Sequence, residues 1–171
     1  MQSFERAPHF YLGVQINAER LVALRNELAV VAERQIGFKP TYTDFLLRAL
    51  ALAIREEPAV NSYWQDGGIA KRDSIDVGFA AQTETGLLVP IVRKAESLSL
   101  FAIATERRSL TERARAGSLT LNEMQGGSAT LSNLGTEGVD WFQAILNPPQ
   151  SVILASGSLA KRPIVIEDRI E

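Results

Sequence analysis

The sequence of 171 residues contains no cysteine. This absence excludes a disulfide framework and a thiolate metal site, and we expect no bound metal ion. It also excludes a protein thiol as nucleophile. Any thiol that takes part in a reaction must therefore belong to a substrate.

Long hydrophobic runs and an excess of one charge are missing as well. No apolar run reaches the roughly 20 residues of a membrane span, and the first ten residues lack the apolar core of a signal peptide. The net charge is −2 with no basic block, so neither nucleic acid nor a membrane is an expected partner. The expected location is the bacterial cytoplasm, or the mitochondrial matrix after removal of a presequence.

What the sequence does contain is typical of one folded domain. Hydrophobic residues make up 46% of it and charged residues 22%, which is ordinary for a globular protein. The length suits a single hydrophobic core. Because no linker, repeat or low-complexity tract interrupts the chain, we treat residues 1–171 as a single domain.

Hydrophobic periodicity predicts three helices and several strands. Apolar residues recur at helical spacing over 21–31, Thr41 and Asp44 have the form of a capping box before the apolar run 45–54, and a serine caps a third helix over 100–116. Strand-like segments cover 10–16, 75–82, 87–92, 128–134 and 152–159. We expect a two-layer α/β (α+β) domain, with a mixed, largely antiparallel sheet covered on one side by the helices.

Several charged residues are expected to be solvated. Asp76 and Glu84 lie beside turns without a convergent partner, which argues against paired-carboxylate chemistry. The arginines of the third helix, Arg107 among them, are interleaved with glutamates as on a solvated helix face.

The most informative stretch is residues 125–151, QGGSATLSNLGTEGVDWFQAILNPPQS. Its paired glycines permit a turn with positive φ. Residues 128–134 alternate like a strand whose small hydroxyl side chains could face a ligand. The pair Pro148-Pro149 stops the next strand, because proline cannot donate to a ladder.

The residues of this stretch, in their order, resemble those of a known protein family. GGSATLSNLG, followed by GVDWFQAILNPPQSVILASGSLAKRP, resembles the catalytic domain of the E2 dihydrolipoamide acyltransferases of 2-oxo acid dehydrogenase complexes. The resemblance extends over nearly the whole chain through PHFYLGVQIN, PTYTDFLLRALALAI, VNSYW and IDVGFAAQTETGLLVPIVRKA. It implies the chloramphenicol acetyltransferase-like fold that this family shares.

The resemblance also implies a reaction, the transfer of an acyl group between coenzyme A and a dihydrolipoyl thiol. In that family a histidine of a His-x-x-x-Asp-Gly motif removes the thiol proton, and a serine of the SNLG strand, here Ser132, donates a hydrogen bond to the tetrahedral oxyanion. Asn133 is expected to serve the geometry of the turn. The lipoyl group is carried on a separate domain, and the site lies between subunits of a homotrimer that can build a larger cage. The E1 and E3 components of the complex are further expected partners.

Arg93 follows a predicted strand directly and has two interpretations. A solvated cation at a strand end is the common one. The resemblance favours a cation near the phosphates of coenzyme A, and we take Arg93 as the candidate cofactor-binding residue.

The chain departs from the family pattern at the histidine. The sequence contains no His-x-x-x-Asp-Gly motif, and its one histidine, His9, lies in Pro-His-Phe near the start. We expect a catalytic core that is incomplete at both ends, and near-inactivity of the 171 residues alone for lack of the general base.

Two alternatives stay open. One is a non-catalytic structural subunit of an E2-like assembly, which accounts for the missing motif equally well. The other is a chloramphenicol-type acetyltransferase that acts on a small alcohol, although the SNLG and NPPQS segments favour the E2 family. The sequence leaves the acyl group (acetyl, succinyl or branched-chain) undetermined, because single methylenes change binding by only about 1–3 kcal/mol.

Overall fold

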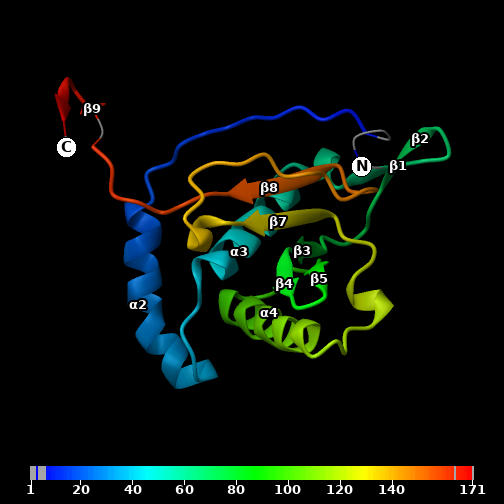
Figure 1. The fold of residues 1–171 in the computed structure, drawn as a ribbon, viewed down its shortest axis with the longest axis horizontal. Helices are drawn as coiled ribbons and strands as arrows, with labels where there is room; N and C mark the ends of the chain where they lie inside the picture. The colour runs from blue at the N-terminus through cyan, green and yellow to red at the C-terminus, as the bar shows by residue number, and fades with distance from the viewer. Residues whose placement is uncertain (1–2, 4–6, 164, 171) are drawn as a thin grey trace.

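A computed structural model describes residue 3 and residues 7–163 and 165–170 of the chain. The α-helices are α2 (Glu19–Ile36), α3 (Tyr42–Glu56) and α4 (Leu100–Arg115), with short 3₁₀ turns η1 (Pro58–Val60), η2 (Leu121–Glu123) and η3 (Gly135–Glu137). The strands are β1 (Ser62–Gln65), β2 (Gly68–Lys71), β3 (Val77–Phe79), β4 (Ala81–Thr83), β5 (Gly86–Leu88), β6 (Ile91–Val92), β7 (Ala129–Asn133), β8 (Val152–Ser156), β9 (Val165–Ile166) and β10 (Arg169–Ile170). Figure 1 shows their arrangement.

Four of these strands form the central sheet, in the order β6-β3-β7-β8. The pairs β3–β7 and β7–β8 are parallel, whereas β6 pairs with β3 in the antiparallel sense. The remaining strands form antiparallel two-stranded hairpins. The predicted mixed sheet is confirmed. Two of the three pairings in the central sheet are parallel and one is antiparallel, and the other antiparallel pairs belong to separate two-stranded sheets.

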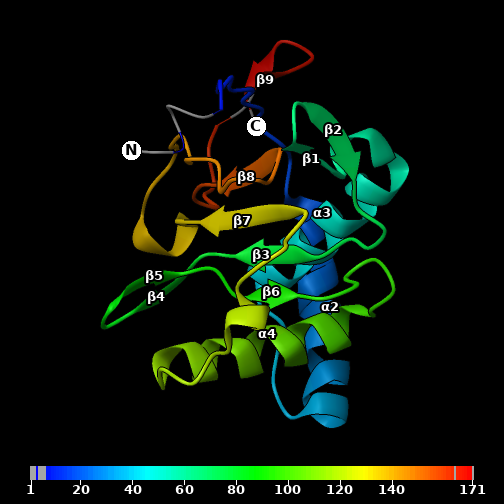
Figure 2. The same ribbon diagram turned by 90° about the vertical axis from the view of Figure 1, so that its right-hand side faces the viewer.

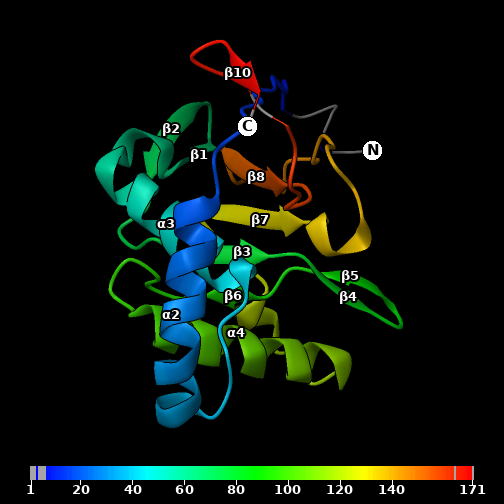
Figure 3. The same cartoon turned by 90° about the vertical axis from the view of Figure 1, so that its left-hand side faces the viewer.

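The helices cover one face of the central sheet. In Figure 2, α3 and α2 lie behind the strands and α4 lies below β6; Figure 3 shows α2 from the opposite side, outermost in the helical layer. The core between the layers is formed by Leu47 and Ile54 of α3, Ile103 and Leu110 of α4, and Leu131 of β7, with smaller neighbours. This is the predicted two-layer α/β architecture. No helix in the described residues is long and apolar enough to cross a membrane.

Local sequence signals explain where the helices begin and end. Thr41 and Asp44 form the predicted capping box at the start of α3, with both reciprocal hydrogen bonds present. Ser99 caps α4 by accepting a hydrogen bond from the amide of Ala102 at 3.1 Å. Gly37 ends α2 in the left-handed conformation, with φ of 77°.

Three of the predicted strands differ in the structure. Residues 10–16 pair with no described strand, and the side chains of Phe10, Leu12, Val14 and Ile16 are 71–88% exposed. A segment becomes a β-strand only where its backbone forms hydrogen bonds with a neighbouring strand. Alternation in the sequence does not supply that neighbour. The predicted strands 75–82 and 87–92 are each interrupted, and Pro90 lies at the second break, next to the edge strand β6.

Candidate active site

Ser132 lies near the carboxyl end of β7, inside the sheet, where it pairs with Ala155 of β8. The side chains of β7 alternate between the two faces. Leu131 belongs to the core beneath the helices, and Asn133 reaches Thr43 of α3. Ser132 therefore faces away from α3. Figure 2 shows α2 and α3 together on one side of the strands.

The Ser132 hydroxyl is available as a hydrogen-bond donor. The residue is half-buried, and no described residue forms a hydrogen bond with its side chain. A hydroxyl that has no internal partner can donate to an oxygen atom that arrives at the surface. The catalytic role of Ser132 stays a prediction.

The backbone beyond Ser132 is packed too closely for side chains. A Cβ atom on Gly135 would lie 2.4 Å from the carbonyl oxygen of Gly157, and one on Gly157 would lie 2.0 Å from that of Asp140. The Leu134 amide donates to the Ser156 carbonyl at 3.0 Å. The turn at Gly135, the loop at Asp140 and the segment at Gly157 therefore pack against one another and hold the end of β7 in place.

Asp140 adds polar contacts at the same place. Its carboxylate accepts hydrogen bonds from the Ser158 hydroxyl and from Arg162, and these lower the pKa of Asp140 below its ordinary value. The loop that crosses the end of β7 is thus tied to the segment after β8.

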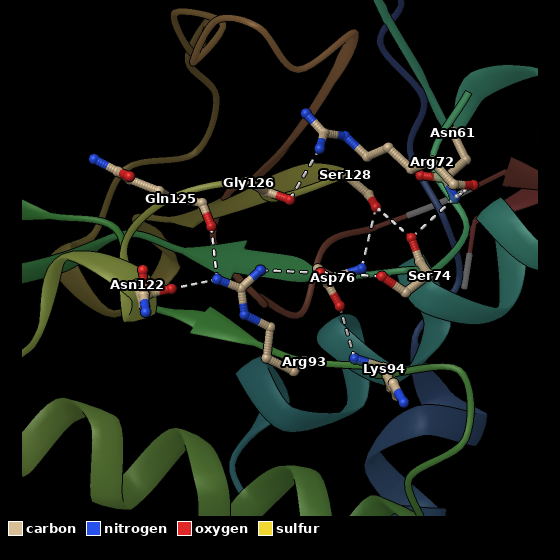
Figure 4. Close-up of polar contacts among 10 residues, drawn as sticks. All are labelled: Asn61, Arg72, Ser74, Asp76, Arg93, Lys94, Asn122, Gln125, Gly126 and Ser128. Carbon is tan, nitrogen blue, oxygen red and sulfur yellow. Dashed lines mark hydrogen bonds and ion pairs between the residues drawn. The ribbon is translucent and has the colours of Figure 1, made fainter. Parts of the chain in front are cut away.

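Arg93 is held by the protein rather than standing free at a strand end. Its Nη1 donates to Asp76 Oδ2 at 2.9 Å, and its Nη2 donates to the carbonyls of Asn122 and Gln125 (Figure 4). Asp76 also accepts from the Lys94 amide at 2.8 Å. The guanidinium therefore fixes the segment that leads into β7.

Asp76 was expected to be solvated, and this expectation is wrong. The residue is 8% exposed and also accepts from the Ser74 hydroxyl. The Ser128 hydroxyl in turn accepts from the Asp76 amide and donates to the Ser74 carbonyl (Figure 4). Burial became possible because the fold supplies Arg93, 17 residues away, as a charge partner.

The structure does not bring Arg93 and Ser132 together. Arg93 donates a hydrogen bond to a residue that precedes β7, whereas Ser132 lies toward the other end of that strand. From Ser128 to Ser132 a strand rises about 13 Å. Arg93 also borders an open groove of about 580 Å³ between α2 and α4, with Ile36, Phe101 and Glu106 in its walls. Its predicted contact with coenzyme A stays a prediction.

His9 has a structural position. Its Nε2 accepts a hydrogen bond from the Leu146 amide at 3.1 Å, so the proton belongs on Nδ1, which donates to the Ala7 carbonyl at 2.7 Å. Both ring nitrogens are engaged. Among the described residues no group of three or more histidine, aspartate or glutamate side chains could hold a metal ion.

Comparison with known proteins decides the family. The model of the 2-oxoacid dehydrogenases acyltransferase catalytic domain matches residues 1–171. The chain belongs to this family. It is 37% identical over 170 residues to the dihydrolipoyllysine-residue acetyltransferase component of the pyruvate dehydrogenase complex of Rickettsia bellii, covering 99% of this chain and 41% of the relative.

Solved structures agree with this assignment. The chain superimposes with a TM-score of 0.95, at 32% identity, on Azotobacter vinelandii dihydrolipoamide acetyltransferase, covering 99% of this chain and 70% of that one. A serine, a histidine and an asparagine of that protein have been investigated for their role in its catalytic mechanism. The cubic core of a pyruvate dehydrogenase multienzyme complex matches with a TM-score of 0.94, at 31% identity, covering 99% of this chain and 70% of that one.

These matches confirm two predictions from the sequence, namely the E2 family and its fold. The chain spans about two fifths of the length of the Rickettsia relative. Sequence reasoning missed the partners of two site residues, the buried Asp76 beside Arg93 and Thr43 beside Asn133. No local signal marks either pair, because 17 and 90 residues separate their members.

Proposed function

We propose that this domain transfers an acyl group between coenzyme A and a dihydrolipoyl group of a 2-oxo acid dehydrogenase complex. One observation carries the proposal: in a chain of this family, the serine of the SNLG strand presents an unbonded hydroxyl on the face of a rigid sheet that points away from α3. Preorganised donors of this kind are the largest single source of stabilisation in many acyl transfers.

The reaction needs one donor and one proton acceptor. A dihydrolipoyl thiol loses its proton to a base as its sulfur attacks the thioester carbon of an acyl-coenzyme A. The carbonyl oxygen becomes an oxyanion, to which the Ser132 hydroxyl donates a hydrogen bond. When the intermediate collapses, the carbon–sulfur bond to coenzyme A breaks and the departing thiolate takes the proton back. The same steps in reverse load coenzyme A from the acylated lipoyl group.

Ser132 acts here as a donor and not as a nucleophile, because no described base contacts its hydroxyl. His9 cannot accept the thiol proton while both of its ring nitrogens are bonded. The base must therefore come from outside these 171 residues or from a residue type other than histidine. Loss of a general base lowers the rate by roughly 10²–10⁴-fold, so the 171 residues alone are expected to turn over slowly.

Arg93 is proposed as the cation that faces the phosphates of coenzyme A. Two of its guanidinium nitrogens already serve the protein, but its side chain is 44% exposed and borders the groove between α2 and α4. The ion pair with Asp76 weakens its attraction for an anion, and we expect a contribution to affinity rather than an anchor.

Self-association as a homotrimer, and as a larger cage, is part of the proposal. Trp141 and the apolar residues of segment 10–16 are exposed in the single chain, and an interface between subunits would bury them. We propose the lipoyl domain and the E1 and E3 components as partners, in the bacterial cytoplasm or the mitochondrial matrix.

The substrate assay tests the proposal. Expressed from its complete gene, the protein should transfer acetyl, succinyl or a branched acyl group from coenzyme A to dihydrolipoamide, and the preferred donor identifies the acyl group. Transfer to chloramphenicol or another small alcohol, with none to dihydrolipoamide, would replace the proposal with the chloramphenicol-type activity.

A structural role is the second candidate, favoured by the single, fully engaged histidine. A gene that stops after residue 171, together with an assembled but inactive protein, would establish it.

A further inference from the structure

Asn133, the residue after Ser132, uses both ends of its side-chain amide. Its Oδ1 accepts a hydrogen bond from the Gly135 amide at 2.9 Å, which closes the turn after β7. Its Nδ2 donates to the Thr43 hydroxyl at 3.1 Å. One side chain therefore connects the end of β7, the turn that follows and the first turn of α3.

The part of α3 to which Asn133 is tied is itself fixed. Asp44, the neighbour of Thr43, is fully buried and accepts hydrogen bonds from both the amide and the hydroxyl of Thr41, at 2.7 and 2.8 Å. It also forms an ion pair with Arg107 of α4. The Thr43 hydroxyl is thus a stationary attachment point.

The hydrogen bond from Asn133 to Thr43 opposes the rotation of β7 that would move Ser132. Successive side chains of a strand point to opposite faces, so any twist of the strand that swings the Ser132 hydroxyl on one face swings Asn133 on the other. The Leu134 amide, bonded to the Ser156 carbonyl, holds the backbone in the plane of the sheet. The bond from Asn133 to Thr43 resists motion out of that plane.

We propose that Asn133 and Thr43 form a positioning pair that sets the direction of the Ser132 hydroxyl. The inference rests on the proposed function, because only a reaction at Ser132 makes this direction matter. Neither residue touches the reacting atoms. A displacement of about 1 Å at a reacting centre can cost about 10²-fold in rate.

Steady-state kinetics of the native assembly, expressed from the complete gene, test the pair. Asn133→Ala and Thr43→Val should each lower kcat by about 10–100-fold and leave both KM values within about twofold. The double variant should be no slower than Asn133→Ala, because both changes break the same bond. Asn133→Asp should restore most of kcat, since its carboxylate can accept from the Gly135 amide and from the Thr43 hydroxyl. Adding Thr43→Val to Asn133→Asp should abolish this rescue.

Thr136→Ala is the matched control. Thr136 lies in the same turn, is exposed, and its side chain bonds only to Glu137 at 3.4 Å. Its kcat should stay at the wild-type value. Circular dichroism and assembly mass confirm that each variant is folded.

The outcomes separate the two proposals. If Asn133→Ala lowers the melting temperature but keeps kcat, or if Asn133→Asp fails to rescue, the positioning role is refuted while the proposed function stands. If the wild-type protein transfers no acyl group, the proposed function fails and the positioning role fails with it. If Ser132→Ala turns over at the wild-type rate, the donor role of Ser132 fails, and the positioning role with it, while acyl transfer stands.

Discussion

Replacing Asp44 by alanine should destabilise the domain strongly. Asp44 is fully buried, and its carboxylate accepts two hydrogen bonds from Thr41 and is paired with Arg107, whose side chain is only 17% exposed. Removing one partner of a buried ion pair costs about 3–5 kcal/mol, because the other charge stays buried without compensation. For a domain of this size that loss corresponds to a fall in Tm of about 6–20 °C.

Urea unfolding at fixed protein concentration, followed by circular dichroism, measures this cost. Lys39→Ala is the control, since its ion pair with Glu33 spans 3.4 Å between side chains that are 56% and 53% exposed. Exposed pairs of this kind contribute below about 1 kcal/mol. A loss below about 1 kcal/mol for Asp44→Ala, or an equal loss in both variants, would refute the reasoning about burial.

Three further predictions concern the surroundings of the site. Gly157→Ala should lower the urea midpoint and kcat together, because its Cβ would lie 2.0 Å from a backbone oxygen; wild-type values for both would contradict the close approach. Hydrogen bonds from the Thr120 amide and from Arg113 lower the pKa of Glu123 from 4.5 to about 2. Ionised Glu123 therefore stabilises the fold above pH 4.5, and the stability difference from Glu123→Gln should be constant above about pH 5 and shrink as the pH falls from 4.5 toward 2. A difference that does not depend on pH would count against those bonds. Arg93→Ala should raise KM for coenzyme A several-fold in steady-state kinetics, and Arg93→Lys, which keeps the charge but cannot form the bonds of both terminal guanidinium nitrogens, should restore only part of that loss; an unchanged KM in both variants would leave Arg93 with a structural role only.

The sequence predicted those features that depend on neighbouring residues. The capping box of Thr41 and Asp44 was found with both of its bonds, and the strand predicted over 128–134 occupies Ala129–Asn133. Capping and alternation are local properties, so a short stretch of sequence determines them.

Features that depend on distant residues were not predictable. Arg107 was expected to be solvated, and it is instead paired with the buried Asp44, 63 residues away. Segment 10–16 has the alternation of a strand but finds no described strand to pair with. In both cases the outcome depends on which surfaces the fold brings together, which the local pattern does not encode.

The effect of Ser132→Ala on acyl transfer by the native assembly tests the central claim most directly. If the hydroxyl at the end of β7 stabilises the oxyanion, kcat for transfer from acyl-coenzyme A to dihydrolipoamide should fall by about 10²–10³-fold, with KM values little changed. A kcat equal to that of the wild-type protein in a correctly folded variant would contradict the account.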